Sequence, residues 1–161
     1  MKAFDPEHIL RSLAKRKVDY VLVGATAARL QGFPRLTADA DITPATTPAN
    51  LGRLALALRD LHARVYTASV PDGLDFDCSA GSLGRAQIWN FVTDAGRLDV
   101  VFKPSGTAGY ADLAATAVDF EAFGIAFQVA SLADILRSKL ASRRPQDLQD
   151  AEVIRQMLRK S

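Results

Sequence analysis

The sequence is poor in the residues that form disulfides and thiolate metal sites. Cys78 is the only cysteine among 161 residues, which excludes an intrachain disulfide and any cysteine-based zinc site. The two histidines, His8 and His62, have no partners at the spacing of metal ligands. A metal bound by this chain would therefore be held by oxygen atoms.

Long apolar runs are also absent. The N-terminus carries no segment of signal-peptide type, and the longest apolar stretches are too short to span a bilayer. We therefore expect a soluble, cytoplasmic protein with no membrane partner. An apolar content of 48% over this length fits a single globular domain that covers residues 1–161.

The excess of positive charge is small. A formal net charge of +2 is too weak to indicate a nucleic-acid-binding protein by itself. Basic residues nevertheless gather toward the C-terminus, at Arg137, Lys139, Arg143, Arg144, Arg155, Arg159 and Lys160. Charge alone therefore leaves the partner open.

Helical and extended patterns alternate along the first half of the chain. Asp5-Pro6 and Thr47-Pro48 each pair a capping residue with proline at a first helical position. The run 18–23 is continuously apolar and stops at Gly24, as expected of a buried strand before a tight connection. The expected elements are a helix over 5–17, a strand over 18–23, a helix over 25–31, a strand over 38–43 and a helix over 47–61.

The second half begins with a loop over 70–84 that includes a short extended piece. The expected elements after it are strands over 86–93 and 97–102 joined by a turn at 94–96, a helix over 110–115, a strand over 125–129, and helices over 131–143 and 145–159. This order predicts an α/β (α+β) domain, in which helices flank a mixed β-sheet and two more helices close the chain.

Two carboxylates stand side by side on the predicted strand 38–43. Asp39 and Asp41 are two residues apart, so both side chains project from the same face. Adjacent negative charges need a counter-charge, and Mg²⁺ prefers oxygen ligands of this kind. Asp99, on a later strand, could complete a site for two metal ions in phosphoryl or nucleotidyl transfer. A solvated strand face is the competing explanation, and on base rates it is at least as common.

The chain contains a second Asp-x-Asp sequence, Asp75-Phe76-Asp77. Its context is the loop-rich stretch, where exposed acids are ordinary. Asp39 and Asp41 instead follow a strand, the Gly24 turn and a short helix, so backbone amides able to approach phosphates lie one element upstream. We therefore prefer the first pair as the metal site.

The C-terminal helices place charged residues among apolar ones. In the helix that begins at Ser131, Lys139 and Arg143 fall within the apolar stripe, either as inward cations or as long side chains that reach past it to solvent. Asp147 and Asp150 fall on the mainly apolar arc of the last helix. A structural ion pair is the simpler role for Asp150, while Asp147 could instead orient Lys139 or an acceptor.

The order and spacing of these motifs resemble a known superfamily. Val23-Gly24-Ala25, a gap of thirteen residues and Asp39-Ala40-Asp41 are similar to the turn and Asp-x-Asp signature of polymerase-beta-like nucleotidyltransferases. The run 24–41 looks like the Gly-Gly-x-Ala and Gly-x-x-Arg-x-Thr-x-Asp-x-Asp motifs of the AbiEii-like toxin group. Residues 131–139 and 144–150 are similar to the C-terminal helical motif of that group.

The resemblance implies a nucleotidyltransferase fold and transfer of an NMP group from an NTP to an RNA (tRNA) or protein acceptor. It also implies a toxin-antitoxin or defence setting with a cognate partner. The implied catalytic residues are Asp39, Asp41, Asp99 and Lys139. The three aspartates would hold two Mg²⁺ ions, or Mn²⁺ in their place. The implied nucleotide contacts are Gly24, Ala25, Thr26, Arg35, Lys139 and Arg143.

Ala25 departs from the superfamily pattern, which has glycine or serine at this position. Thr26 could supply the missing hydroxyl. The departure motivates a second hypothesis, a degenerate member that binds nucleotide or a partner without catalysis. Phosphotransfer to a small molecule such as an aminoglycoside is a third, which the short chain disfavours because it leaves little room for an acceptor domain.

Overall fold

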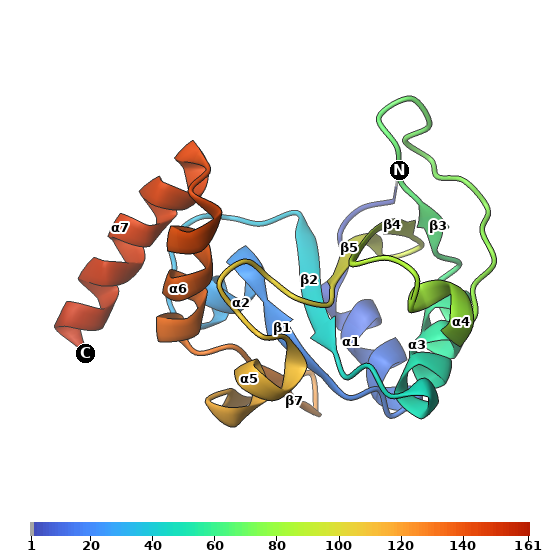
Figure 1. Ribbon diagram of the computed structural model, residues 1–161, viewed down its shortest axis with the longest axis horizontal. Coiled ribbons are helices and arrows are strands. Elements are labelled where there is room, and N and C mark those ends of the chain that lie inside the picture. The colour runs from blue at the N-terminus through green and yellow to red at the C-terminus, as the bar shows by residue number, and fades with distance from the viewer. Residues whose placement is uncertain (1) are drawn as a thin grey trace.

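A computed structural model describes residues 2–161, and a mixed β-sheet forms its centre (Figure 1). The strands are β1 (Tyr20–Val23), β2 (Asp39–Pro44), β3 (Arg64–Val65), β4 (Ile88–Thr93), β5 (Gly96–Val101), β6 (Val118–Ala122) and β7 (Ile125–Val129). Their order across the sheet is β3-β4-β5-β2-β1-β7-β6. Strand β2 runs parallel to β5 and antiparallel to β1, so the predicted mixed α/β class is confirmed.

Seven helices surround the sheet within the described residues. They are α1 (Pro6–Lys15), α2 (Gly24–Leu30), α3 (Pro48–Asp60), α4 (Ala80–Leu83), α5 (Tyr110–Ala115), α6 (Leu132–Ser142) and α7 (Pro145–Lys160). Figure 1 shows α6 and α7 side by side at one end of the molecule, with α3 and α4 at the other. None of these helices is long and apolar enough to cross a membrane.

Strand alternation gives the sheet one apolar face and one face that carries the acids. Leu22, Ala40 and Leu98 are buried on the face that α1 covers. Asp41 and Asp99 alternate with these residues and therefore project from the opposite face. The core thus fixes which way the acidic side chains point, because a slip of one residue would bury them.

Capping side chains fix where three helices begin, as the sequence predicts. Asp5 accepts a hydrogen bond from the His8 amide at 3.1 Å, and Thr47 accepts one from the Asn50 amide at 3.2 Å. Ser131 accepts one from the Asp134 amide at 3.1 Å. The spacing of Ser131 and Asp134 also predicts a reciprocal capping box, but the Asp134 carboxylate instead bonds Thr116 and Arg137.

The structure also corrects several expectations. Strands β3 and β6 and the short helix α4 were not predicted, because β3 has only two residues and β6 carries alternating acids on largely exposed positions. Helix α1 ends two residues early, and β1 starts at Tyr20 since the Val18 amide still bonds the Leu13 carbonyl. Arg143 does not point inward: α6 ends at Ser142, and Arg143 is an exposed cap with a φ of 57°.

Candidate active site

Three carboxylates from two neighbouring strands meet above the centre of the sheet. Asp41 lies directly opposite Asp99 in the parallel β2–β5 pair, and Asp39 is two residues before Asp41. Each residue offers one oxygen, and these oxygens lie within 4.8 Å of one another. The structure thus brings together the three aspartates that the sequence singled out.

Gly24 allows the Asp41 carboxylate to lie against the turn between β1 and α2. Its φ of +72° belongs to the left-handed region, which glycine adopts at little cost. A Cβ atom at this position would collide with the Asp41 carboxylate. Glycine is therefore required at this position for a steric reason, independently of any contact with a nucleotide.

Burial and neighbouring charges oppose ionisation of Asp41 and Asp99. Burial, together with the Asp39 and Asp99 charges, raises the pKa of Asp41 to about 8, although Lys139 acts in the opposite direction. Burial also raises the pKa of Asp99, against the lowering effect of Arg97. Asp99 Oδ1 is buried without a hydrogen-bond partner. These features are those of a cluster suited to binding a cation.

A cleft of about 610 Å³ opens beside the cluster, between the sheet and the C-terminal helices. Asp41, Asp99 and Gly24 lie on its sheet side, whereas Lys139 and Arg144 line its helical side. The cleft therefore places carboxylates opposite cations, an arrangement that suits a metal ion next to phosphate groups.

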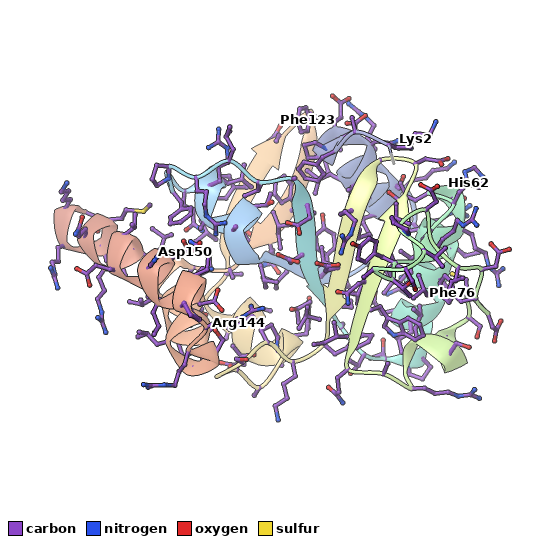
Figure 2. All side chains as sticks on the ribbon, turned by 90° about the horizontal axis from the view of Figure 1, so that it is seen from above. Lys2, His62, Phe76, Phe123, Arg144 and Asp150 are labelled. Carbon is purple, nitrogen blue, oxygen red and sulfur yellow. The ribbon has the colours of Figure 1, made fainter. Side chains whose placement is uncertain are left out.

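Lys139 is the most buried of the cleft cations. Its side chain is 11% exposed, and its Nζ lies 3.0 Å from Asp150 and 3.4 Å from Asp147. Asp150 also bonds Arg35 at 2.5 Å, and Asp147 bonds Arg144 at 2.8 Å. Figure 2 labels Asp150, which lies on α7, and Arg144, which lies just before α7 begins. The structural ion pair expected for Asp150 is thus confirmed, and Asp147 belongs to the same network.

Four residues expected to contact nucleotide do not line this cleft: Ala25, Thr26, Arg35 and Arg143. The Thr26 hydroxyl donates to the Asp39 carbonyl at 2.5 Å and lines a groove on the opposite side of the sheet. Arg35 is committed to Asp150. The structure therefore does not place the Thr26 hydroxyl where it could replace one missing at Ala25.

The rival acidic pair has local partners. The Asp75 side chain is 96% exposed, 3.8 Å from Arg64, and Asp77 accepts hydrogen bonds from Ser79 and Ser82 at 3.1 and 2.8 Å. Neither residue belongs to the carboxylate cluster found among residues 2–161. Asp77 thus helps to begin helix α4.

Sequence reasoning missed several polar residues of the cleft, among them Lys103, Arg144 and Asn90. Lys103 lies just beyond both the predicted strand 97–102 and β5, so strand alternation did not place it. Asn90 is directly opposite Asp99 in the β4–β5 hairpin, which the turn at 94–96 had indicated. Nothing local in the sequence distinguishes Arg144, because it reaches the cleft through the packing of α7 on α6.

No protein-family model and no curated protein matches the sequence. Solved structures do share the fold. A proposed nucleotidyltransferase from Thermotoga maritima is 17% identical, with a TM-score of 0.53 over 99% of this chain and 98% of its own. The antibiotic-resistance factor ANT(2'')-Ia is 16% identical, with a TM-score of 0.53 over 96% of this chain and 89% of its own. The chain therefore has a nucleotidyltransferase-like fold.

Proposed function

We propose that the protein is a metal-dependent nucleotidyltransferase that moves an NMP group from an NTP to an acceptor hydroxyl and releases pyrophosphate. The observation that carries this proposal is the convergence of Asp39, Asp41 and Asp99 within 4.8 Å, with Asp41 and Asp99 lining a cleft whose other side bears cations. The fold shared with a proposed nucleotidyltransferase supports the same reaction class.

The three aspartates fit a pair of divalent cations. Carboxylate oxygens are the ligands that Mg²⁺ prefers, and Mn²⁺ accepts the same ligands. Burial and the neighbouring carboxylates raise the pKa of Asp41, and Asp99 Oδ1 is buried without a hydrogen bond, so a bound cation would stabilise both acids in their charged form. Such ions would supply charge stabilisation to the attacking and leaving oxygens of the transferred phosphoryl group.

The chain's own residues would bind and orient the substrates. The Gly24 turn would bring backbone amides close to phosphate oxygens, and Lys139, together with the more exposed Lys103 and Arg144, would neutralise the triphosphate. Asp99 would accept the proton of the attacking hydroxyl while the hydroxyl oxygen forms a bond to the α-phosphorus. The bond from the α-phosphorus to the bridging oxygen then breaks, and pyrophosphate leaves.

The resemblance to the AbiEii-like toxin group supports an RNA acceptor, such as tRNA, or a protein side chain. It also supports a toxin-antitoxin or defence setting in the cytoplasm with a cognate partner chain. These assignments rest on motifs at both ends of the chain, residues 24–41 and 131–150.

Incubation of the protein with each labelled NTP, Mg²⁺ and either total tRNA or a protein extract tests the proposal. Label should enter one acceptor class, and chelation of the metal should abolish transfer. The Asp41→Ala variant should be inactive, while Asp75→Ala, which changes the rival Asp-x-Asp sequence, should keep full activity. An active preparation that Asp41→Ala leaves unchanged would refute the assignment.

A binding module without catalysis is the second candidate, and the position of Thr26 favours it. With Ala25 in the turn and the Thr26 hydroxyl bonded to the Asp39 carbonyl, neither residue offers a hydroxyl to a triphosphate. Calorimetry with Mg²⁺ and each NTP separates the candidates. Metal-dependent nucleotide binding without turnover on any acceptor would identify the binding module.

A further inference from the structure

Arg97 places a cation inside the acidic centre. It lies directly opposite Asp39 in the β2–β5 pair and two residues before Asp99, so its side chain shares their face of the sheet. Its guanidinium nitrogen is 3.7 Å from Asp99 Oδ1, and the side chains of Arg97 and Asp99 are 24% and 17% exposed. The protein thus carries its own counter-charge beside one of the three carboxylates.

This ion pair is incomplete. A separation of 3.7 Å is too long for a hydrogen bond, and both Arg97 Nε and Asp99 Oδ1 are buried without any hydrogen-bond partner. Buried polar atoms are normally matched, and unmatched ones are costly. The contact therefore supplies charge to Asp99 but leaves its oxygen unsatisfied.

Tyr66 holds the guanidinium in place. The Arg97 guanidinium carbon lies 3.7 Å from the centre of the Tyr66 ring, a close cation–π stack. The Tyr66 amide in turn donates to the Asn90 carbonyl at 2.8 Å, which ties the ring to β4. Stacking on Tyr66 therefore helps to hold Arg97 beside Asp99.

We propose that Arg97 is an internal counter-ion that takes the electrostatic place of a divalent cation at Asp99, so that free metal binds weakly and nucleotide promotes its binding. This inference rests on the proposed function. A fixed cation next to Asp99 repels an incoming divalent ion, because like charges at these separations interact strongly in a partly buried site. The triphosphate brings negative charge that offsets this repulsion, so metal and nucleotide bind cooperatively.

Calorimetry with Mn²⁺ alone, and with Mn²⁺ plus each NTP, tests this in the full chain. Wild-type protein should bind Mn²⁺ weakly alone and more tightly with nucleotide. Arg97→Met, which removes the charge, should bind Mn²⁺ alone about tenfold more tightly, yet melt at a lower temperature in EDTA because the acids lose their counter-charge. If Arg97 had a purely structural role, its replacement would lower both Mn²⁺ affinity and melting temperature. Tighter Mn²⁺ binding together with a lower melting temperature therefore distinguishes the counter-ion role.

A second pair of variants keeps every charge and covers the case in which Arg97→Met fails to fold. Tyr66→Leu removes the aromatic ring that fixes the guanidinium and should tighten Mn²⁺ binding severalfold, while Tyr66→Phe keeps the ring and should match wild type. Unchanged or weaker Mn²⁺ binding by Arg97→Met and Tyr66→Leu would overturn the counter-ion role of Arg97 but leave the proposed function standing. Wild-type protein that binds no Mn²⁺, with or without nucleotide, would overturn the proposed function as well.

Discussion

Replacement of Asp41 by asparagine should make the metal-free protein more stable while it removes metal binding. The substitution keeps the size and shape of the side chain but deletes one of three charges whose oxygens lie within 4.8 Å. Asp41 has two such neighbours, Asp39 and Asp99, so two repulsions disappear. A site built for a cation is expected to cost stability when the cation is absent.

The size of the gain follows from Coulomb's law. At 4.8 Å and an effective dielectric constant of about 20, one carboxylate pair repels by about 3.5 kcal/mol. Protonation of Asp41, whose pKa is raised to about 8, and the attraction of Lys139 both reduce this repulsion. A net gain of roughly 2 kcal/mol remains near pH 8, which for a chain of this size is about 4–8 °C in melting temperature.

The sign of the pH dependence follows from proton uptake. The native pKa of Asp41 lies above its unfolded value, so between about pH 4 and pH 8 the folded state binds more protons than the unfolded state. Wild-type stability therefore falls across this window as pH rises, and the Asp41→Asn variant lacks this loss because its amide does not titrate. The stabilisation by Asp41→Asn should be larger at pH 8 than at pH 5.

Thermal unfolding in EDTA at both pH values, then at pH 8 with added Mg²⁺, measures these effects. Mg²⁺ should raise the melting temperature of wild type but not of Asp41→Asn. Asp75→Asn is the matched control, since it deletes the same charge from a side chain that is 96% exposed and should change little. The charge-repulsion reasoning would be refuted if Asp41→Asn lowered the melting temperature in EDTA. It would also be refuted if Asp41→Asn raised the melting temperature equally at both pH values.

Two further substitutions probe the turn and the helical side of the cleft. Gly24→Ala should abolish transfer and cost roughly 1–3 kcal/mol, because its Cβ collides with Asp41 in a left-handed backbone. Gly52→Ala, in open space on α3, should instead stabilise by about 0.5–1 kcal/mol, and the two melting curves test the contrast. Lys139→Met should cost about 1.5–3 kcal/mol in denaturant unfolding, since Asp147 and Asp150 lose their shared cation but keep Arg144 and Arg35. Adding Asp150→Asn should recover stability but not nucleotide affinity; recovery of both would show that Lys139 has only a structural role.

Much of the fold could be predicted because apolar periodicity and helix caps act locally. Strand β7 has the predicted bounds, and α3 and α6 begin at their capping residues. Strand alternation also placed Asp39 and Asp41 on one face. The parallel pairing of β2 with β5 sets Asp41 opposite Asp99, and it depends on long-range packing. From the sequence we could expect only that the strand of Asp99 neighbours that of Asp41.

The remaining features of the site depend on contacts that spacing does not encode. On an ideal helix Arg143 would lie on the apolar stripe, but α6 ends one residue before it. The helical periodicity therefore does not apply to Arg143. Arg35 was expected to contact nucleotide, and only the packing of α7 shows that Asp150 binds it. Alternation within the predicted strand 97–102 places Arg97 on the face of Asp99, but its stacking on Tyr66 depends on a distant strand end.

The position of the transferred phosphorus tests the central proposal most directly. Protein, Mg²⁺ and total tRNA or protein extract are incubated with an NTP that carries label on either the α- or the γ-phosphate. Label from the α-phosphate should enter the acceptor, γ-label should appear only in pyrophosphate, and Asp99→Asn should abolish both. Transfer of γ-label to the acceptor, or α-label transfer that survives Asp99→Asn, would contradict nucleotidyl transfer at this site.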